Sequence, residues 1–209
     1  MSHDVASSQG LVCLDLEGVL VPEIWIAVAE RTGIPELRRT TRDEPDYNAL
    51  MHYRIDIMER EGLRMSLIED VISGLDPLPG ARDFLDRVRR RTQLVILSDT
   101  FEQFARPLME HLGRPTIMCH RLVVDKDCIV GYRLRQANQK QRAVEAFKSL
   151  NYRVVAAGDS YNDTTMLGAA DAGFLFHAPP KVIAEFPQFP ALNTYDELFE
   201  SLMKALDSD

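Results

Sequence analysis

The sequence is poor in the features that would place this protein in a membrane or on nucleic acid. No apolar stretch approaches the roughly 18 residues that a membrane-spanning helix needs. Asp and Glu outnumber Lys and Arg by 32 to 24, and the formal net charge of −8 argues against the basic face that nucleic-acid binding requires. We therefore expect a soluble protein whose partners include neither a membrane nor a nucleic acid.

Cysteine and histidine are also scarce. The three cysteines are an odd number without close pairing, and Cys13 and Cys119 lie in apolar runs that are typical of buried thiols. A reduced, cytoplasmic setting fits this usage best. The histidines lack the spacing of metal ligands. Residues 1–10 have no apolar core of a signal peptide, and we expect them to form a flexible N-terminus.

Short apolar runs that end in an acidic residue are the main signal of the sequence. They are L11-V-C-L-D15, L94-V-I-L-S-D99 and V154-V-A-A-G-D159, and a similar run, A172-G-F-L-F-H177, ends in histidine. Continuous apolar runs of this length fit strands that are buried on both faces. Amphipathic helical patterns at 80–91 and 141–150 alternate with them. The alternation predicts an α/β protein with a doubly wound, mostly parallel sheet.

Two segments depart from this alternation. From Pro22 to about Pro79 no strand is expected, and helices are expected at 23–32, 47–61 and 66–73. Residues 117–135 are typical of a β-hairpin, and residues 195–207 of an amphipathic helix. The sequence thus predicts a helical cap domain, residues 22–78, inserted into an α/β core domain of residues 11–21 and 79–209.

The acidic strand ends are expected to meet at one place. Ligands of a doubly wound sheet bind beyond the carboxyl ends of its strands. Asp15, the Ser98–Asp99 pair and Asp159 all fall at such ends. One acid alone would more simply cap a helix or close a turn, but three together favour a functional site.

Four motifs give the sequence a family resemblance. In order, D15-L-E-G-V19, the Ser98–Asp99 pair, Lys140 in Q139-K-Q-R142, and G158-D-S-Y-N-D163 resemble the motifs of the haloacid dehalogenase superfamily of phosphotransferases. The helical segment and the hairpin are similar to those of phosphoserine phosphatases. The D-L-E-G variant, with V-P-E-I-W, H-A-P and E-F-P-Q-F-P, resembles the phosphoserine phosphatases that also transfer phosphate to homoserine. Glu17 departs from the family pattern D-x-D-x-T/V, whereas Val19 fits it.

The resemblance implies phosphate transfer through a phosphoaspartate at Asp15, with Mg²⁺ held by Asp15, Asp159 and the backbone carbonyl of Glu17. A phosphomonoester carries about two negative charges, so a carboxylate nucleophile needs a metal ion and a cation beside it. Lys140 would be that cation, and Lys148, deeper in the same helix, is its rival. Glu17 would give a proton to the leaving alcohol and later remove one from the acceptor.

The remaining motif residues would hold the phosphoryl group and the lysine. Ser98 and Asp99 would bind phosphoryl oxygens through the hydroxyl and backbone N–H groups. Asp163 would orient Lys140 or a metal-bound water. Asn162, in the same motif, would contact the substrate.

The helical segment is expected to select the substrate. By resemblance, Glu23 would bind the ammonium group of phosphoserine and Arg54 its carboxylate, while Tyr47 matches an aromatic position of the cap. A solvated helix face remains the alternative for all three. Trp25, at apolar helical spacing, is expected only to pack.

The implied function is Mg²⁺-dependent transfer of phosphate from O-phosphoserine to water or to homoserine. The same chemistry on another small phosphate ester, such as a nucleotide or sugar phosphate, is the nearest alternative. A third is a silent phosphate-ligand sensor, although the nucleophile, the lysine and the metal acid are all present. The sequence leaves the oligomeric state open, a homodimer included.

Overall fold

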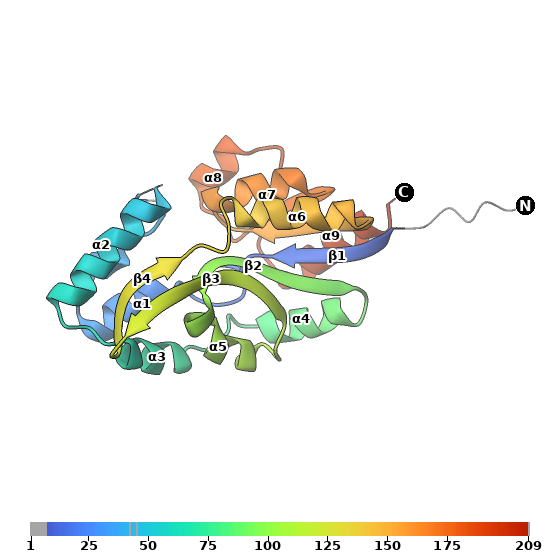
Figure 1. The fold of residues 1–209 in the computed structure, drawn as a ribbon. Helices are drawn as coiled ribbons and strands as arrows, with labels where there is room; N and C mark the ends of the chain where they lie inside the picture. The colour runs from blue at the N-terminus through green and yellow to red at the C-terminus, as the bar shows by residue number, and fades with distance from the viewer. Residues whose placement is uncertain (1–7, 42, 45, 209) are drawn as a thin grey trace, which may run out of the picture.

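A seven-stranded sheet forms the centre of the protein in a computed structural model that describes residues 8–41, 43–44 and 46–208 (Figure 1). The strand order is β4-β3-β2-β1-β5-β6-β7, and β4 alone among these strands runs antiparallel to its neighbour. The strands are β1 (Gln9–Leu14), β2 (Gln93–Phe101), β3 (Thr116–Asp125), β4 (Cys128–Arg133), β5 (Tyr152–Gly158), β6 (Ala172–Phe176) and β7 (Ala191–Leu192). The predicted doubly wound α/β fold and the predicted hairpin, β3–β4, are confirmed.

Helices follow most of the predicted helical patterns. They are α1 (Ile24–Thr32), α2 (Tyr47–Arg60), α3 (Met65–Ser73), α4 (Ala81–Arg89), α5 (Glu102–His111), α6 (Gln139–Ser149), α7 (Thr164–Ala169), α8 (Pro180–Glu185) and α9 (Tyr195–Leu206), with 3₁₀ turns at η1 (Pro35–Arg38) and η2 (Tyr161–Asp163). Within the described ranges, no helix is both long enough and apolar enough to cross a membrane. The predicted flexible N-terminus lies mostly outside the described residues, and β1 begins at Gln9, earlier than expected.

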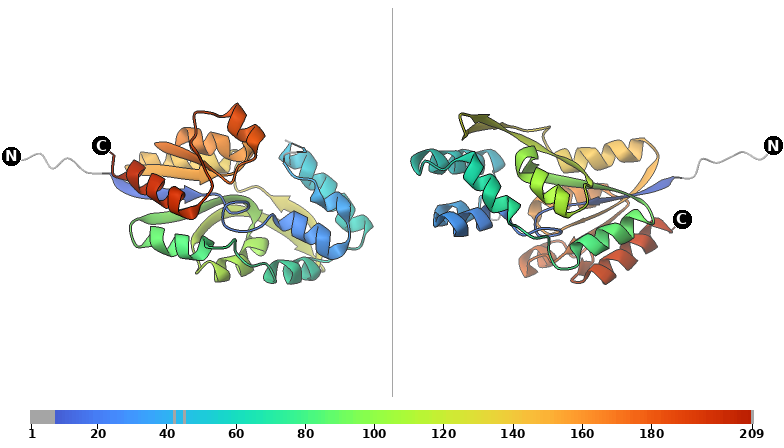
Figure 2. Two further views of the ribbon diagram at one scale, coloured as in Figure 1. Left: turned by 180° about the vertical axis from the view of Figure 1, so that it is seen from behind. Right: turned by 90° about the horizontal axis from the view of Figure 1, so that it is seen from below.

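Both faces of the central strand are covered by helices. Leu11 and Cys13 belong to a core shared with α6 and α7, whereas Val12 and Leu14 belong to one shared with α4 and α9. Figure 2 shows α4 and α9 side by side on the face opposite α6. Because neither face meets water, the strand keeps no polar alternation, which explains its continuous apolar run.

The α1–α3 segment lies beyond the carboxyl end of β1 and is attached to the hairpin (Figure 1). The N–H and hydroxyl of Ser66, in α3, donate to the Asp127 carboxylate in the hairpin turn at 2.8 and 2.6 Å. The Tyr132 hydroxyl of β4 donates to Asn48 of α2 at 2.7 Å. These contacts hold α2 over the strand ends. The division into a cap and a core domain stays a prediction.

The cysteines differ in exposure, which predicts an order of thiol reactivity. Cys13 is buried in β1 and burial raises its pKa to about 12. Cys119 is also buried, and burial followed by the Glu102 charge raises its pKa to about 11. Cys128 is partly exposed. Since the thiolate is the reactive form, we expect a disulfide reagent at about pH 8 to modify Cys128 first and Cys13 only on unfolding. Cys128→Ser should remove the fast phase, and a fast phase that survives would contradict this order.

Candidate active site

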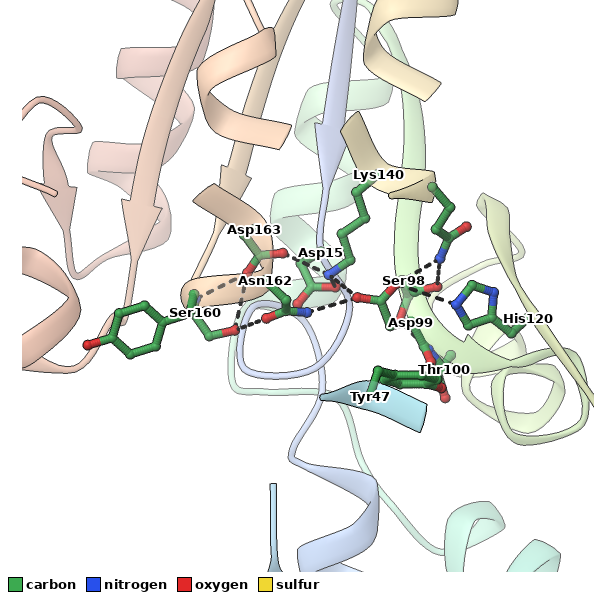
Figure 3. A network of polar contacts seen from close by, with 12 residues as sticks. Asp15, Tyr47, Ser98, Asp99, Thr100, His120, Lys140, Ser160, Asn162 and Asp163 are labelled. Atoms are coloured by element: carbon green, nitrogen blue, oxygen red, sulfur yellow. Dashed lines mark hydrogen bonds and ion pairs between the residues drawn. The ribbon is translucent and has the colours of Figure 1, made fainter. Parts of the chain in front are cut away.

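A buried lysine lies among carboxylates that follow or end three strands. Lys140, at the start of α6, donates to Asp15 Oδ1 at 2.8 Å and to Asp163 Oδ1 at 2.7 Å, and its Nζ lies 3.6 Å from Asp99 Oδ2 (Figure 3). Burial alone would lower the pKa of Lys140, but the three carboxylates outweigh it and raise this pKa well above its usual value. Lys140 is therefore a cation at any ordinary pH.

The rival lysine lies elsewhere. Lys148 pairs with Asp171 at 2.8 Å and donates to the carbonyl of Ala169 at 3.1 Å. Lys148 does not line the cavity that Lys140 lines. The helix start, rather than its middle, points at the strand ends.

Asp15, Asp159 and Asp163 form a buried cluster that could hold a metal ion. One oxygen from each lies within 4.8 Å of the others, and the three side chains are buried. Burial, together with the Asp163 and Asp159 charges, raises the pKa of Asp15 well above its usual value in spite of Lys140. Three carboxylates against one ammonium leave excess negative charge, and oxygen ligands of this kind are those that Mg²⁺ prefers. The donor set therefore fits a divalent cation.

Backbone groups hold this cluster closely. The Asp163 carboxylate accepts the N–H groups of Asp159 at 3.0 Å and Ser160 at 3.1 Å, so the loop after β5 folds around it. Gly18, with φ of 76°, lies so near Asp159 that a Cβ there would be 2.6 Å from Asp159 Oδ2. A side chain at position 18 would thus displace a carboxylate of the cluster.

Glu17 turns away from the cluster and toward the helical segment. Its Oε2 accepts the backbone N–H of Ile24, the first residue of α1, at 2.9 Å. Burial and then the Glu23 charge raise the pKa of Glu17 to about 7, although the Ile24 bond and the Arg54 charge lower it. If Glu17 contacts a metal, its backbone carbonyl rather than its side chain is the available group.

The end of β2 presents one hydroxyl and one carboxylate. Ser98 Oγ accepts the N–H of Thr100 at 3.2 Å, so the Ser98 hydroxyl keeps its own proton for another acceptor in the cavity. The Asp99 carboxylate accepts from Gln139 at 3.1 Å and from Asn162 at 2.9 Å. A carboxylate has no donor for a phosphoryl oxygen, so an Asp99 contact with phosphate would have to come from its backbone.

The residues expected to select the substrate line the same cavity as Asp15. This cavity has a volume of about 70 Å³. The Tyr47 hydroxyl donates to the backbone carbonyl of Asp99 at 2.7 Å, which joins α2 to β2. Glu23 and Arg54 lie on the wall that α1 and α2 provide. Every site residue of the sequence analysis lines this cavity except Asp163, which is fully buried and contacts Lys140.

Arg54 is a buried cation with an unsatisfied donor. Its Nη2 donates to the Arg39 carbonyl at 2.8 Å, and its guanidinium lies 4.5 Å from the centre of the Trp25 ring. Within the described residues, its Nε has no hydrogen-bond partner. Burial lowers the pKa of Arg54 to about 10, so it stays charged at neutral pH. An anionic ligand group in the cavity would supply the missing acceptor.

Several residues of the site were not predicted. Trp25 packs as expected but also supports Arg54 and lines the cavity. Gln139 donates to the Ser98 carbonyl at 2.5 Å. Its position directly before Lys140 in the sequence could have indicated that it belongs to the site. Ser160, which was not predicted, forms a capping box with the predicted Asp163, and this spacing is visible in S160-Y-N-D163. His120 carries no local signal, because its contact with Asp99 joins distant parts of the chain.

Comparisons with known proteins find relatives that share one family. A profile of the haloacid dehalogenase-like hydrolase family matches residues 14–168. The chain is 62% identical over 196 residues to a phosphoserine phosphatase of Pseudomonas syringae pv. tomato, covering 93% of this chain and 83% of the relative. It is 60% identical over 196 residues to phosphoserine phosphatase ThrH of Pseudomonas aeruginosa, covering 93% and 96%.

Solved structures show the same fold at low identity. A substrate-bound phosphoserine phosphatase complex matches with a TM-score of 0.78 over 97% of this chain and 100% of that chain, at 19% identity. A phospho-aspartyl intermediate analogue of phosphoserine phosphatase matches with a TM-score of 0.77 over 93% and 99%, also at 19% identity. At this identity the likeness concerns the fold alone.

Replacing Gly18 should impair metal binding specifically. Gly18→Ala and Gly33→Ala both place a side chain at positive φ, 76° and 73°, and each should cost about 1–2 kcal/mol of stability. A Cβ on Gly33 meets no described atom within 4 Å, whereas one on Gly18 meets Asp159. We expect Mg²⁺ to raise the melting temperature of the wild type and of Gly33→Ala but not that of Gly18→Ala. An equal Mg²⁺ effect in both variants would contradict the role given to Gly18.

Proposed function

The chain belongs to the haloacid dehalogenase-like hydrolase family, and on that premise we propose that it transfers phosphate from O-phosphoserine, through an aspartyl phosphate at Asp15, to water or to homoserine. The two relatives at 60% identity or more are both named phosphoserine phosphatase, which supports the donor. Homoserine as acceptor rests on the resemblance of the D-L-E-G segment described above.

The observation that carries the proposal is the position of Lys140 between the proposed nucleophile, Asp15, and the neighbouring carboxylates. Lys140 contacts Asp15 directly, and the cavity above them also contains the Ser98 hydroxyl and the Arg54 guanidinium. These groups offer positive charge and a hydroxyl donor to a phosphate dianion, although carboxylates also line the cavity and the protein as a whole is acidic. Mg²⁺, held by Asp15 and Asp159 with the Glu17 carbonyl, would supply further positive charge to offset that of the phosphoryl oxygens.

In the first half-reaction an oxygen of Asp15 attacks phosphorus, and the bond between phosphorus and the serine oxygen breaks. Glu17 gives its proton to that oxygen, so serine leaves as an alcohol and Glu17 becomes a carboxylate. Lys140 and the Ser98 hydroxyl stabilise the negative charge on the phosphoryl oxygens as the bond changes. The product is an acyl phosphate on Asp15.

In the second half-reaction Glu17 takes a proton from water or from the homoserine hydroxyl. The oxygen so activated attacks phosphorus, and the bond to Asp15 breaks, which restores its carboxylate. The products are inorganic phosphate or phosphohomoserine. Both acceptors use the same acyl phosphate, so their ratio depends on which one the cavity places in line with it.

The wall formed by α1 and α2 suits an amino acid as donor. The Nε of Arg54, which has no hydrogen-bond partner in the described part of the chain, offers a hydrogen bond to a carboxylate, and an Arg–carboxylate pair is among the stronger polar contacts in a protein. Glu23, on the same wall, is an acid suited to an ammonium group. A phosphate ester without these two groups would leave the buried guanidinium short of an acceptor.

Asp15→Asn should abolish turnover of O-phosphoserine. The amide lacks the nucleophilic carboxylate, so we expect phosphate release to fall to background while the fold, measured by circular dichroism, is unchanged. The matched control is Asp171→Asn, which changes a carboxylate remote from the cavity. The measurement is free phosphate in the presence of Mg²⁺. Turnover retained by Asp15→Asn would exclude the aspartyl phosphate.

Measuring free phosphate and phosphohomoserine in the same reaction identifies the acceptor of the phosphoryl group. With O-phosphoserine and Mg²⁺, added homoserine should give phosphohomoserine at the expense of free phosphate. Glu17→Asp shortens the side chain and breaks its reach to the Ile24 N–H, so we expect a lower ratio of transfer to hydrolysis in this variant. Free phosphate that homoserine leaves unchanged would identify a phosphatase without transferase activity.

A further inference from the structure

The Asp99 carboxylate contacts four side chains of the protein. Oδ1 accepts from Gln139 Nε2 at 3.1 Å and lies 3.6 Å from His120 Nε2. Oδ2 accepts from Asn162 Nδ2 at 2.9 Å and lies 3.6 Å from Lys140 Nζ (Figure 3). A carboxylate has about four lone-pair sites, two on each oxygen. Each oxygen thus accepts one hydrogen bond and faces one further protein nitrogen at 3.6 Å, so a substrate ammonium group would have to compete with these protein groups for the carboxylate.

These partners keep Asp99 charged. Burial alone would raise the pKa of Asp99, but the Lys140 charge, the His120 contact and the hydrogen bonds from Asn162 and Gln139 hold it well below its usual range. A fixed negative charge beside a phosphate site opposes phosphate binding unless it serves another group. Lys140 is the cation that it faces.

Lys140 needs such a partner when Asp15 reacts. Before the reaction Lys140 lies between Asp15 at 2.8 Å and Asp163 at 2.7 Å. Once Asp15 has become an acyl phosphate, its carboxylate charge is gone. Asp163 on one side and Asp99 on the other are then the carboxylates that remain beside the ammonium group (Figure 3).

Asp99 also connects the loops that carry the catalytic groups. Asn162, in the turn between Asp159 and Asp163, donates to Asp99 and accepts from Ser160 Oγ at 2.5 Å. Gln139, the residue before Lys140, donates to both the Asp99 carboxylate and the Ser98 carbonyl. One carboxylate thus joins the end of β2 to the start of α6 and to η2.

His120 fixes Asp99 from the side of the hairpin. It is 4% exposed on β3, and its Nδ1 accepts the backbone N–H of Arg135 at 3.1 Å. This bond places the imidazole proton on Nε2, the atom that faces Asp99. At 3.6 Å the contact is electrostatic rather than a full hydrogen bond. The Tyr47 ring, 5.7 Å away, closes the other side of the imidazole.

From these contacts we propose that Asp99 is a positioning residue that holds Lys140 against the transferring phosphoryl group, and that His120 acts through Asp99; this rests on the phosphotransfer function proposed above. In this role the Asp99 carboxylate acts through Lys140 and does not itself touch the reacting atoms. Its loss should therefore slow the chemical steps more than it weakens substrate binding.

The test compares kcat and KM of wild type, Asp99→Ala and Asp99→Asn with O-phosphoserine and with p-nitrophenyl phosphate, which has no amino group. We expect Asp99→Ala to lower kcat about 10–100-fold for both substrates with little change in KM, the usual cost of losing an outer-shell partner. Asp99→Asn, which keeps one oxygen acceptor, should recover part of the loss. Asp171→Asn is the control, because its carboxylate pairs with Lys148 outside the cavity.

The role of His120 is tested by a double-mutant cycle. His120→Leu should lower kcat by a smaller factor, and His120→Gln, whose amide can place a donor near the Nε2 position, should recover most of it. If His120 acts through Asp99, adding His120→Leu to Asp99→Ala should cost nothing more. Independent, multiplying effects would overturn this part of the proposal.

Two results would overturn the positioning role of Asp99. An unchanged kcat in Asp99→Ala is one. The other is a higher KM for O-phosphoserine alone, with normal kinetics for p-nitrophenyl phosphate, because that pattern belongs to an ammonium-binding residue. Wild-type turnover of p-nitrophenyl phosphate without turnover of O-phosphoserine would instead contradict the proposed donor, and the kcat comparison on p-nitrophenyl phosphate would still decide the role of Asp99.

Discussion

The ammonium group of Lys140 compensates the charge that the parallel sheet forces into one place. Strands β1, β2 and β5 are neighbours or near neighbours, and each ends close to a carboxylate of the site. Buried like charges repel, and a carboxylate left unpaired in such a position costs about 3–5 kcal/mol. Lys140 reaches Asp15, Asp163 and Asp99 at once. Even so the carboxylates outnumber it, and this surplus makes the site receptive to a divalent cation and then to a phosphate.

Two loops whose backbone passes close to the carboxylates hold this cluster together. Gly18 lets the loop after β1 pass beside Asp159, and the Asp163 carboxylate is held by the N–H groups of Asp159 and Ser160. Each of these contacts is short-range and directional, so the carboxylates have little freedom to separate. The repulsion among them is therefore retained in the folded protein rather than relaxed by side-chain movement.

The sequence predicted the parts of the fold and site that local patterns encode. The buried strands follow from apolar runs, and the position of Asp15 and Asp159 follows from the acids that end two of them. Lys140 was preferred to Lys148 because a helix start faces the strand ends, and the structure places it there. The helix α5 was not predicted. It carries Pro107 in its interior, and a proline there weakens the sequence pattern that indicates a helix.

Contacts between distant segments could not be predicted in this way. His120 meets Asp99 because β3 pairs with β2 past an irregularity in register, and nothing in the residues around position 120 indicates that shift. Arg54 was expected to bind the carboxylate of the substrate. Its contact with the Trp25 ring was not expected, because that contact depends on how α1 and α2 pack. Side chains that act through another side chain leave no spacing pattern in the sequence.

The length of the Glu17 side chain lets it contact the start of the helical segment. An aspartate there would end about one carbon–carbon bond short of the point where Glu17 accepts the Ile24 N–H at 2.9 Å. That N–H is one of the unpaired donors at the start of α1, so the glutamate satisfies a group that a shorter acid would leave to water. The Glu17 side chain and the first turn of α1 are thereby held as one unit. In the mechanism proposed above, a wall fixed in this way would leave less room for disordered water beside the acyl phosphate, and a hydroxy amino acid whose carboxylate binds Arg54 would gain in the competition for it.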